Sequence, residues 1–154
     1  MSDAQIKRML AFVAGREDPK KLLQLAKNAD DRGEEALAQA ARLKLYSILP
    51  GDDPGTIEYA VWQSIFALED VLKQERGKTI LLARTRQRIG RQGVTQCVAD
   101  LVLGSASEGF KMLEERAMLD LSFEAIALDF PDEFEPRVLE AARRRLVDAG
   151  HTVK

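Results

Sequence analysis

The sequence contains very little cysteine, histidine or aromatic side chain. Its single cysteine, Cys97, excludes an intrachain disulfide and a zinc site built from cysteines. A catalytic cysteine needs a histidine partner in space, and the single histidine, His151, lies in a C-terminal segment that is expected to fray. We therefore predict that Cys97 is a half-buried apolar residue on a helix and not a nucleophile.

Long apolar runs are also missing. No window approaches the roughly 20 apolar residues that a membrane-spanning helix requires. The N-terminal stretch carries an early acid, Asp3, and lacks the apolar core of a signal peptide. The sequence therefore predicts a cytoplasmic protein without membrane contact. The formal net charge is only -2, so any attraction to an anionic polymer must arise from a local cluster of charge.

Apolar residues recur at helical spacing almost throughout, and β-branched alternation nowhere extends over the length of a strand. The 154 residues are 45% hydrophobic and 31% charged, which suits one globular domain or two small helical subdomains that share a core. We predict an all-α fold, a compact bundle of eight or nine short helices. The broadest apolar face belongs to residues 56–75, which we predict to form a central helix.

Turn-forming residues divide the chain. An αα-hairpin is expected over residues 19–48, with Asp18 as the first cap and a turn at Gly33. The stretch LPGDDPG, at 49–55, holds two prolines and two glycines and is the best internal boundary. We predict an N-terminal hairpin subdomain at 1–50 and a C-terminal multi-helix subdomain at 55–150, around one shared core. Further helices are expected at about 4–14, 78–90, 94–103, 107–117, 122–130 and 136–149.

Acidic residues are absent from one stretch. Between Glu75 and Asp100 lie 24 residues without a carboxylate, although the chain has 25 acids in 154 positions. The same interval carries six positive charges, at Arg76, Lys78, Arg84, Arg86, Arg88 and Arg91. This local excess of positive charge is typical of an anion-binding surface. A second group, Arg143 to Arg145, would extend the surface if the last helix packed beside residues 78–90.

Three of these arginines share one helical face. At about 100° per residue, Arg84, Arg88 and Arg91 fall within about 60° of one another. Like charges at this spacing repel, so a partner anion is required to offset the cost. The anion is either the phosphate of a nucleic acid, which the planar guanidinium suits, or a carboxylate of the chain itself. The internal candidates are Glu58 and Glu69, which we expect to be partly buried at the edge of the central helix's apolar face.

The arginine stretch ends in Gly90-Arg91-Gln92-Gly93. This motif resembles the Gly-x-x-Gly loop of KH nucleic-acid-binding domains, which joins two helices and clamps the nucleic-acid backbone. The segment that follows, VLGSASEGFKML, has a helical pattern where a KH domain has a β-strand. A helix-turn-helix alignment on Gly93 is also poor, because it places Arg88 and Gln92 at buried apolar positions. The alternative is that the glycines form a tight turn and the arginines form salt bridges.

The sequence contains no catalytic constellation. Its carboxylate pairs are adjacent along the chain, so their side chains diverge on a helix. The Gly-Lys-Thr step at 77–79 lacks the upstream glycine of a phosphate-binding P-loop. We therefore predict no bound metal and no cofactor. An enzyme would need Glu58, Glu69 and the arginines to converge on one cleft.

Residues 72–146 resemble a helical C-terminal region found in uncharacterised bacterial proteins. The similarity rests on RTRQ at 84–87, Gly93-Val94, GFKML at 109–113, FEAIAL at 123–128 and a proline before a final arginine-rich helix. The resemblance implies a shared fold over about half of the chain and supplies no activity. It places Arg84, Arg86 and Gln87 first among the residues to be tested.

We therefore predict a non-catalytic nucleic-acid-binding accessory protein that contacts DNA or RNA through a basic helix-turn surface. The predicted contact residues are Arg84, Arg86, Gln87, Arg88, Arg91 and Gly93. The alternative is a protein-protein interaction module or homodimeric helical scaffold that does not bind nucleic acid. In that case the hairpin at 19–48 or an exposed apolar face docks a partner or a second copy.

Overall fold

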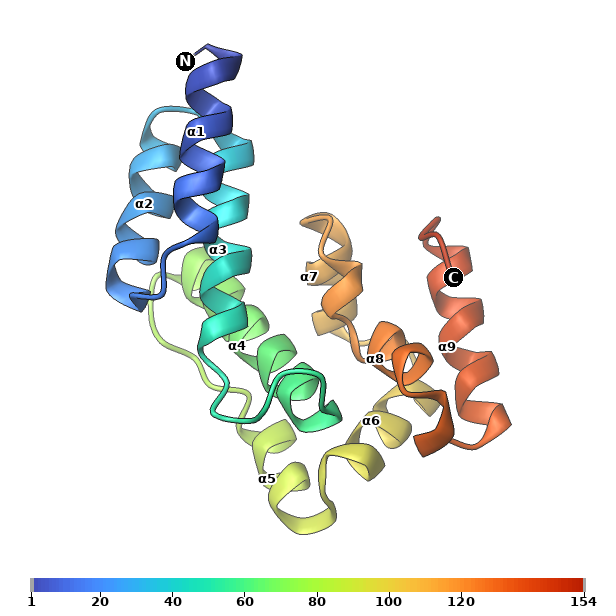
Figure 1. The fold of residues 1–154 in the computed structure, drawn as a ribbon. Helices are drawn as coiled ribbons and strands as arrows, with labels where there is room; N and C mark the ends of the chain where they lie inside the picture. The colour runs from blue at the N-terminus through green and yellow to red at the C-terminus, as the bar shows by residue number, and fades with distance from the viewer. Residues whose placement is uncertain (1, 154) are drawn as a thin grey trace. The chain divides into compact units, whose positions relative to one another are not determined.

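The computed structural model describes residues 2–153 (Figure 1). Over these residues the chain forms nine α-helices and two short 3-10 helices and contains no strand, which confirms the predicted all-α fold. The chain divides into two units, the first ending at Pro50 and the second beginning at Gly51. Among the helices of the described range, none is both long enough and apolar enough to cross a membrane.

The first unit consists of α1 (Asp3–Ala14), α2 (Pro19–Asp31) and α3 (Glu35–Ile48). Asp18 begins α2, because its carboxylate accepts the backbone N–H of Lys20 at 3.0 Å. Gly33, at φ +72°, turns the chain from α2 into α3 in a conformation that glycine adopts without strain. The helices α2 and α3 pack as the predicted hairpin, and α1 packs on α3.

The second unit contains the remaining helices. They are α4 (Ile57–Arg76), α5 (Ala83–Gln92), α6 (Val94–Leu103), α7 (Glu108–Glu115), α8 (Phe123–Asp129) and α9 (Pro136–Asp148), with 3-10 segments at Leu119–Leu121 and Pro131–Glu133. The hydroxyls of Thr56, Ser107 and Ser122 each accept the backbone N–H three residues later. These caps fix where α4, α7 and α8 begin.

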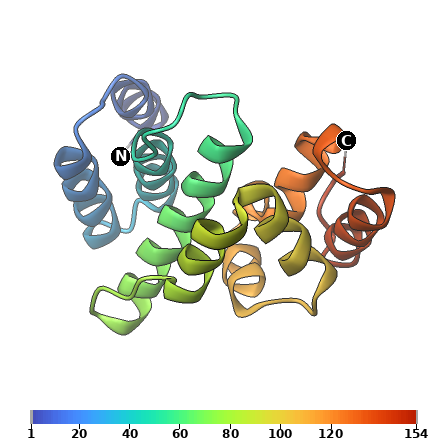
Figure 2. The ribbon, with the colours of Figure 1, turned by 90° about the horizontal axis from the view of Figure 1, so that it is seen from below.

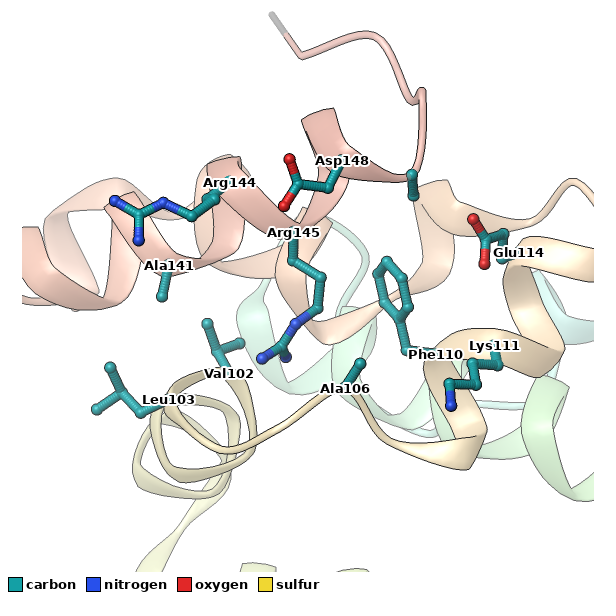
Figure 3. A pocket seen from close by; sticks show the side chains of 11 residues that line it. Val102, Leu103, Ala106, Phe110, Lys111, Glu114, Ala141, Arg144, Arg145 and Asp148 are labelled. Carbon is teal, nitrogen blue, oxygen red and sulfur yellow. The ribbon is translucent and has the colours of Figure 1, made fainter.

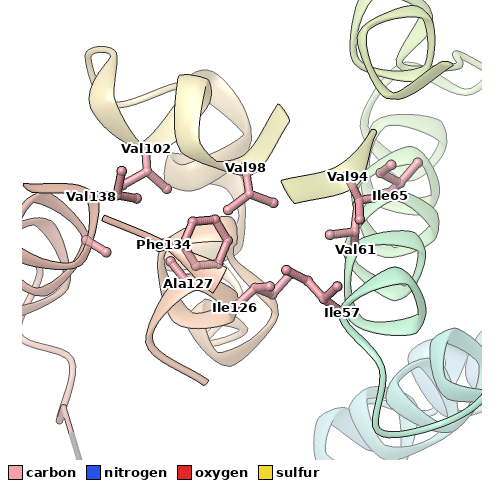
Figure 4. Packing of buried hydrophobic residues seen from close by; sticks show 11 residues of the cluster. Ile57, Val61, Ile65, Val94, Val98, Val102, Ile126, Ala127, Phe134 and Val138 are labelled. Carbon is pink, nitrogen blue, oxygen red and sulfur yellow. The ribbon is translucent and has the colours of Figure 1, made fainter. Parts of the chain in front are cut away.

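Part of the core of the second unit is an apolar cluster from α4, α6, α8, α9 and Phe134, which precedes α9 (Figure 4). In α4 and α6 its members recur every four residues, so each helix presents a single face to the cluster. The buried members are Ile57, Val61, Ile65, Val94, Val98, Val102, Ile126, Ala127, Phe134, Val138 and Ala142. Helix α6 packs on α4, α8 and α9, and Figure 2 shows α4 in green beside α6 in darker yellow. The core therefore anchors α6, and with it the turn that joins α6 to α5.

One helix begins later than the sequence predicts. A helix is expected at 78–90, but α5 spans Ala83–Gln92. Gly77, in the left-handed conformation at φ +71°, ends α4, and the chain stays non-helical up to Leu82. The backbone N–H of Leu82 donates to the Glu69 carboxylate at 2.8 Å. This contact with α4 satisfies the backbone donor of the residue that precedes α5. The local spacing of apolar residues gives no sign of such a contact.

Cys97 lies on α6 and is fully buried, so the predicted half-buried position is wrong. Burial raises the pKa of its thiol, and the nearby Arg88 guanidinium opposes that shift. Because the thiolate is the reactive form, we expect dithiobis(nitrobenzoic acid) to label the folded protein only as fast as it unfolds. In denaturant the same thiol should react at once. Rapid labelling of the folded protein would show that the side chain is accessible.

Candidate nucleic-acid interface

The predicted contact residues lie on α5 and at the turn that follows it. None of the ten residues of α5 is buried. Arg84, Gln87 and Arg91 are exposed, and Arg88 is half-buried. The helix is therefore an outer element of the second unit, with nearly all of its polar side chains in reach of solvent.

Arg86 differs from the other arginines of α5 because it binds an internal carboxylate. Its Nε donates to Glu69 Oε2 at 2.8 Å and a terminal nitrogen donates to Glu69 Oε1 at 2.6 Å. The pair is bidentate, and the side chains of Glu69 and Arg86 are 10% and 31% exposed. The hydrogen bonds that Arg86 donates to Glu69 raise the pKa of its guanidinium still further. This arginine is charged and held in place by α4.

Two aromatic rings of α4 complete the surroundings of Arg86. Its guanidinium carbon lies 5.2 Å from the centre of the Trp62 ring and 5.9 Å from that of Phe66. Both distances are within the range of a cation–π interaction. The rings face this guanidinium from the same helix that carries Glu69, so together they hold α5 against α4. Spacing along α4 could have suggested the group, because residues 62, 66 and 69 share a helical face.

The other candidate carboxylate, Glu58, does not behave as the sequence predicts. It is exposed rather than partly buried, and no ion pair within residues 2–153 involves it. Of the two internal anions considered, only Glu69 contacts α5, and its partner is Arg86. Glu58 and Glu69 thus do not converge with the arginines on one cleft of the described chain.

Arg84, Arg88 and Arg91 have no carboxylate partner in the structure. No hydrogen bond or ion pair between described residues involves any of the three. They recur at intervals of four and three residues, so they follow one face over about 10 Å of helix axis. We call this set of three residues the arginine face. No carboxylate of the described chain forms an ion pair with it.

The glycines at the end of α5 do not form a four-residue loop. Gly90 lies within α5, and the helix continues to Gln92. Gly93 alone makes the turn into α6, at φ +86°, a conformation that side-chain-bearing residues rarely adopt. The geometry therefore differs from that of the Gly-x-x-Gly loop that this motif resembles. The arginine face ends where the chain reverses at Gly93.

The second arginine group is largely engaged within the protein. Arg144 donates to Glu140 at 2.9 Å and Arg145 donates to Glu124 at 2.5 Å. Arg145 also donates to the backbone carbonyl of Gly104. The helix that carries them, α9, packs on α6 and α8. These guanidiniums are held by acceptors of the chain and are not equivalent to the arginine face.

An open hollow of about 500 Å³ lies beside this group, lined from α6, α7 and α9 (Figure 3). Its cations are Lys111, Arg144 and Arg145, and its anions are Glu114 and Asp148. Opposite charges are thus mixed around it, and two of the three cations are already paired. The hollow lacks the uncompensated positive charge that the arginine face shows.

No group of three His, Cys, Asp or Glu side chains that could hold a metal ion occurs in the described part of the chain. No protein family model, curated protein or solved structure matches this chain. The resemblance of residues 72–146 to a bacterial helical region stays a prediction. The interpretation of the site rests on the geometry of α5 and its neighbours.

Proposed function

We propose that the protein binds the phosphate backbone of a nucleic acid through the arginine face of α5 and performs no chemistry on it. The observation that carries the proposal is that Arg84, Arg88 and Arg91 share one helical face and that no carboxylate of residues 2–153 pairs with them. Phosphate is the anion that suits them, because the guanidinium fork matches its oxygens and remains charged at any physiological pH.

The surroundings of the arginine face favour an external anion. The 24 residues between Glu75 and Asp100 contain no acid, so no neighbour along the chain repels a phosphate. Gln87, exposed on α5, offers an amide donor beside the arginines. Arg86 takes the role of a positioning residue, because its bidentate bond to Glu69 holds α5 on α4.

Backbone contact without base readout is the mode that this surface supports. The aromatic rings nearest to α5, those of Trp62 and Phe66, are half-buried and face Arg86. They therefore offer no platform on which single-stranded bases could stack. We expect little sequence preference, and affinity that depends mainly on the number of phosphates contacted.

Binding should depend strongly on salt. Three phosphate contacts on duplex DNA give a slope of about -2.7 in log K against log salt, or about 40-fold weaker binding between roughly 50 and 200 mM salt. Each alanine substitution in the arginine face should lower the slope by about one. Fluorescence anisotropy with labelled duplex DNA, duplex RNA and single strands measures these slopes, and the duplex that binds more tightly identifies the preferred nucleic acid.

A charge-matched control separates a specific face from general attraction. The test variant Arg84→Ala/Arg88→Ala/Arg91→Ala and the control Lys21→Ala/Lys27→Ala/Arg143→Ala each remove three positive charges. All three control residues are exposed and lie outside α5. The proposal requires that the test variant loses most of the binding and the control retains most of it. If both variants lose the same amount of binding affinity, the affinity depends on net charge alone and the proposal is refuted.

The rival function, a docking module for a protein partner or a second copy, has its own outcome. Leu81, two residues before α5, is 56% exposed and would offer such a partner an apolar contact. If α5 lies in a homodimer interface, light scattering will show a wild-type dimer that the triple arginine variant converts to a monomer. A monomer with salt-dependent duplex binding supports the nucleic-acid proposal.

A further inference from the structure

A cavity of about 460 Å³ lies inside the second unit, lined from α4, α5, α6, α7 and the start of α8. This volume is within the range of small-molecule sites. Much of its wall is apolar, with Leu68, Leu82, Leu101, Phe110, Leu113 and Phe123 among the lining residues. It lies next to the hollow of Figure 3, which opens between α6, α7 and α9, and Phe110 lines both.

Most polar groups at the cavity wall already have partners. The Ser122 hydroxyl donates to the Leu119 carbonyl at 2.6 Å, and the Ser107 hydroxyl accepts from Phe110 N at 3.1 Å. The Glu124 carboxylate accepts from Arg145 at 2.5 Å. Glu108, at the exposed side, accepts from Arg76 at 3.3 Å. These polar groups therefore have little hydrogen-bonding capacity left for a ligand.

Ser64 is the exception at the buried side of the cavity. Its side chain is fully buried on α4, and its Oγ has no hydrogen-bond partner among the described residues. A buried hydroxyl without a partner costs free energy, and proteins rarely leave one in that state. At the wall of a cavity, such a hydroxyl can form a hydrogen bond with a polar atom of a bound molecule.

Arg84, an exposed residue, supplies positive charge at the cavity wall. It lines the cavity from the first turn of α5, and no carboxylate of the described chain pairs with it. The only acid on the exposed side, Glu108, is paired with Arg76. Among the described residues, the cavity lining thus combines apolar side chains with the unpaired Ser64 hydroxyl and the unpaired Arg84 guanidinium.

We propose that this cavity binds a small, largely apolar organic anion. The apolar body of the ligand lies among the leucines and phenylalanines, a polar atom on it pairs with the Ser64 hydroxyl, and its anionic group pairs with the Arg84 guanidinium. This site goes beyond the proposed nucleic-acid function. The two share Arg84 only, so a ligand in the cavity and a phosphate on α5 compete for that guanidinium.

Two fluorescent probes test the assignment on the full chain. Anilinonaphthalene sulfonate carries apolar rings, an N–H and a sulfonate, whereas N-phenylnaphthylamine has the rings and the N–H without the charge. We expect Arg84→Ala to weaken the anionic probe about tenfold and to leave the neutral probe within about twofold. Ser64→Ala should weaken both probes about three- to tenfold, because both lose the same hydrogen bond.

Arg91→Ala is the matched control for charge. Arg91 belongs to the arginine face of the same helix but does not line the cavity. It should change neither probe affinity, although it lowers the salt slope for duplex DNA. If Arg91→Ala and Arg84→Ala weaken the binding of the anionic probe equally, its affinity depends on the overall charge of the protein and the proposal fails. The cavity proposal is also overturned if the neutral probe does not bind the wild-type protein. The nucleic-acid proposal is tested separately, by the titration with duplex DNA.

The folded state must be verified, because anilinonaphthalene sulfonate also binds loosely packed states. Circular dichroism and two-dimensional NMR spectra of each variant supply that control. In the wild type, the probes should shift the amide resonances of Ser64, Thr85 and Phe123. Shifts confined to residues outside the cavity would place the probes elsewhere and refute the site. Ser64→Ala should also raise the midpoint of thermal unfolding of the free protein, since it removes an unpaired buried hydroxyl.

Discussion

Glu124→Ala is expected to lower the free energy of unfolding of the second unit by about 3–5 kcal/mol. Its carboxylate accepts from Arg145 at 2.5 Å, and the two side chains are only 6% and 17% exposed. Alanine leaves the Arg145 guanidinium in the same place with one acceptor, the Gly104 carbonyl, in place of two. Leaving a buried charge without enough partners is among the substitution effects that lower the free energy of unfolding most.

Urea denaturation followed by the fluorescence of Trp62 measures the effect, because this single tryptophan lies on α4 of the second unit. Glu140→Ala is the surface control: Glu140 and Arg144 are 70% and 71% exposed, and losing such a pair costs less than about 1 kcal/mol. The double variant Glu124→Leu/Arg145→Met should recover much of the loss, since no buried charge remains. If Glu124→Ala costs no more than Glu140→Ala, the pair is not the buried link that its geometry indicates.

The fold follows from local chemistry to a large extent. The apolar spacing and the caps at Asp18, Ser107 and Ser122 place the helices within a few residues of their observed bounds. Glycines in the left-handed conformation end or join helices at Gly33 and Gly77. These signals act within one turn of the chain, and so a sequence displays them directly.

The candidate site follows from the sequence only in part. The absence of acids near α5 is visible along the chain, and it directs attention to the arginine face. Which arginine meets Glu69 is not visible, because 17 residues separate Arg86 from its partner and the choice depends on how α5 packs on α4. The late start of α5 has the same cause. The buried Glu124 is missed for a related reason, since its partner lies 21 residues away on α9.

The cavity has no signature in the sequence at all. Its lining comes from five helices, and Ser64 lies within a helix whose pattern reads as apolar core. A serine there is unremarkable until the packing shows that its hydroxyl is buried and unpaired. Sites of this kind depend on the space that side chains leave unfilled, a property of the packed fold and not of any segment.

Glu69→Ala is the second change with a large expected effect. The carboxylate accepts three hydrogen bonds, two from Arg86 and one from the backbone N–H of Leu82. Its removal leaves a guanidinium and a backbone donor without their acceptor at the start of α5. We expect a loss of about 2–4 kcal/mol, less than for a fully buried pair because Arg86 is 31% exposed and water can reach it.

The same urea titration measures this loss, with Glu58→Ala as the control. Glu58 is an exposed glutamate of the same helix, and its removal should change stability by less than about 0.5 kcal/mol. Glu69→Gln should fall between the two, because an amide oxygen can still accept from Leu82 but the charge opposite Arg86 is gone. Equal stabilities of Glu69→Ala and Glu58→Ala would mean that α5 is held by its apolar contacts alone. The ordering Ala, Gln, wild type at position 69 would instead show that one carboxylate positions the helix that carries the arginine face.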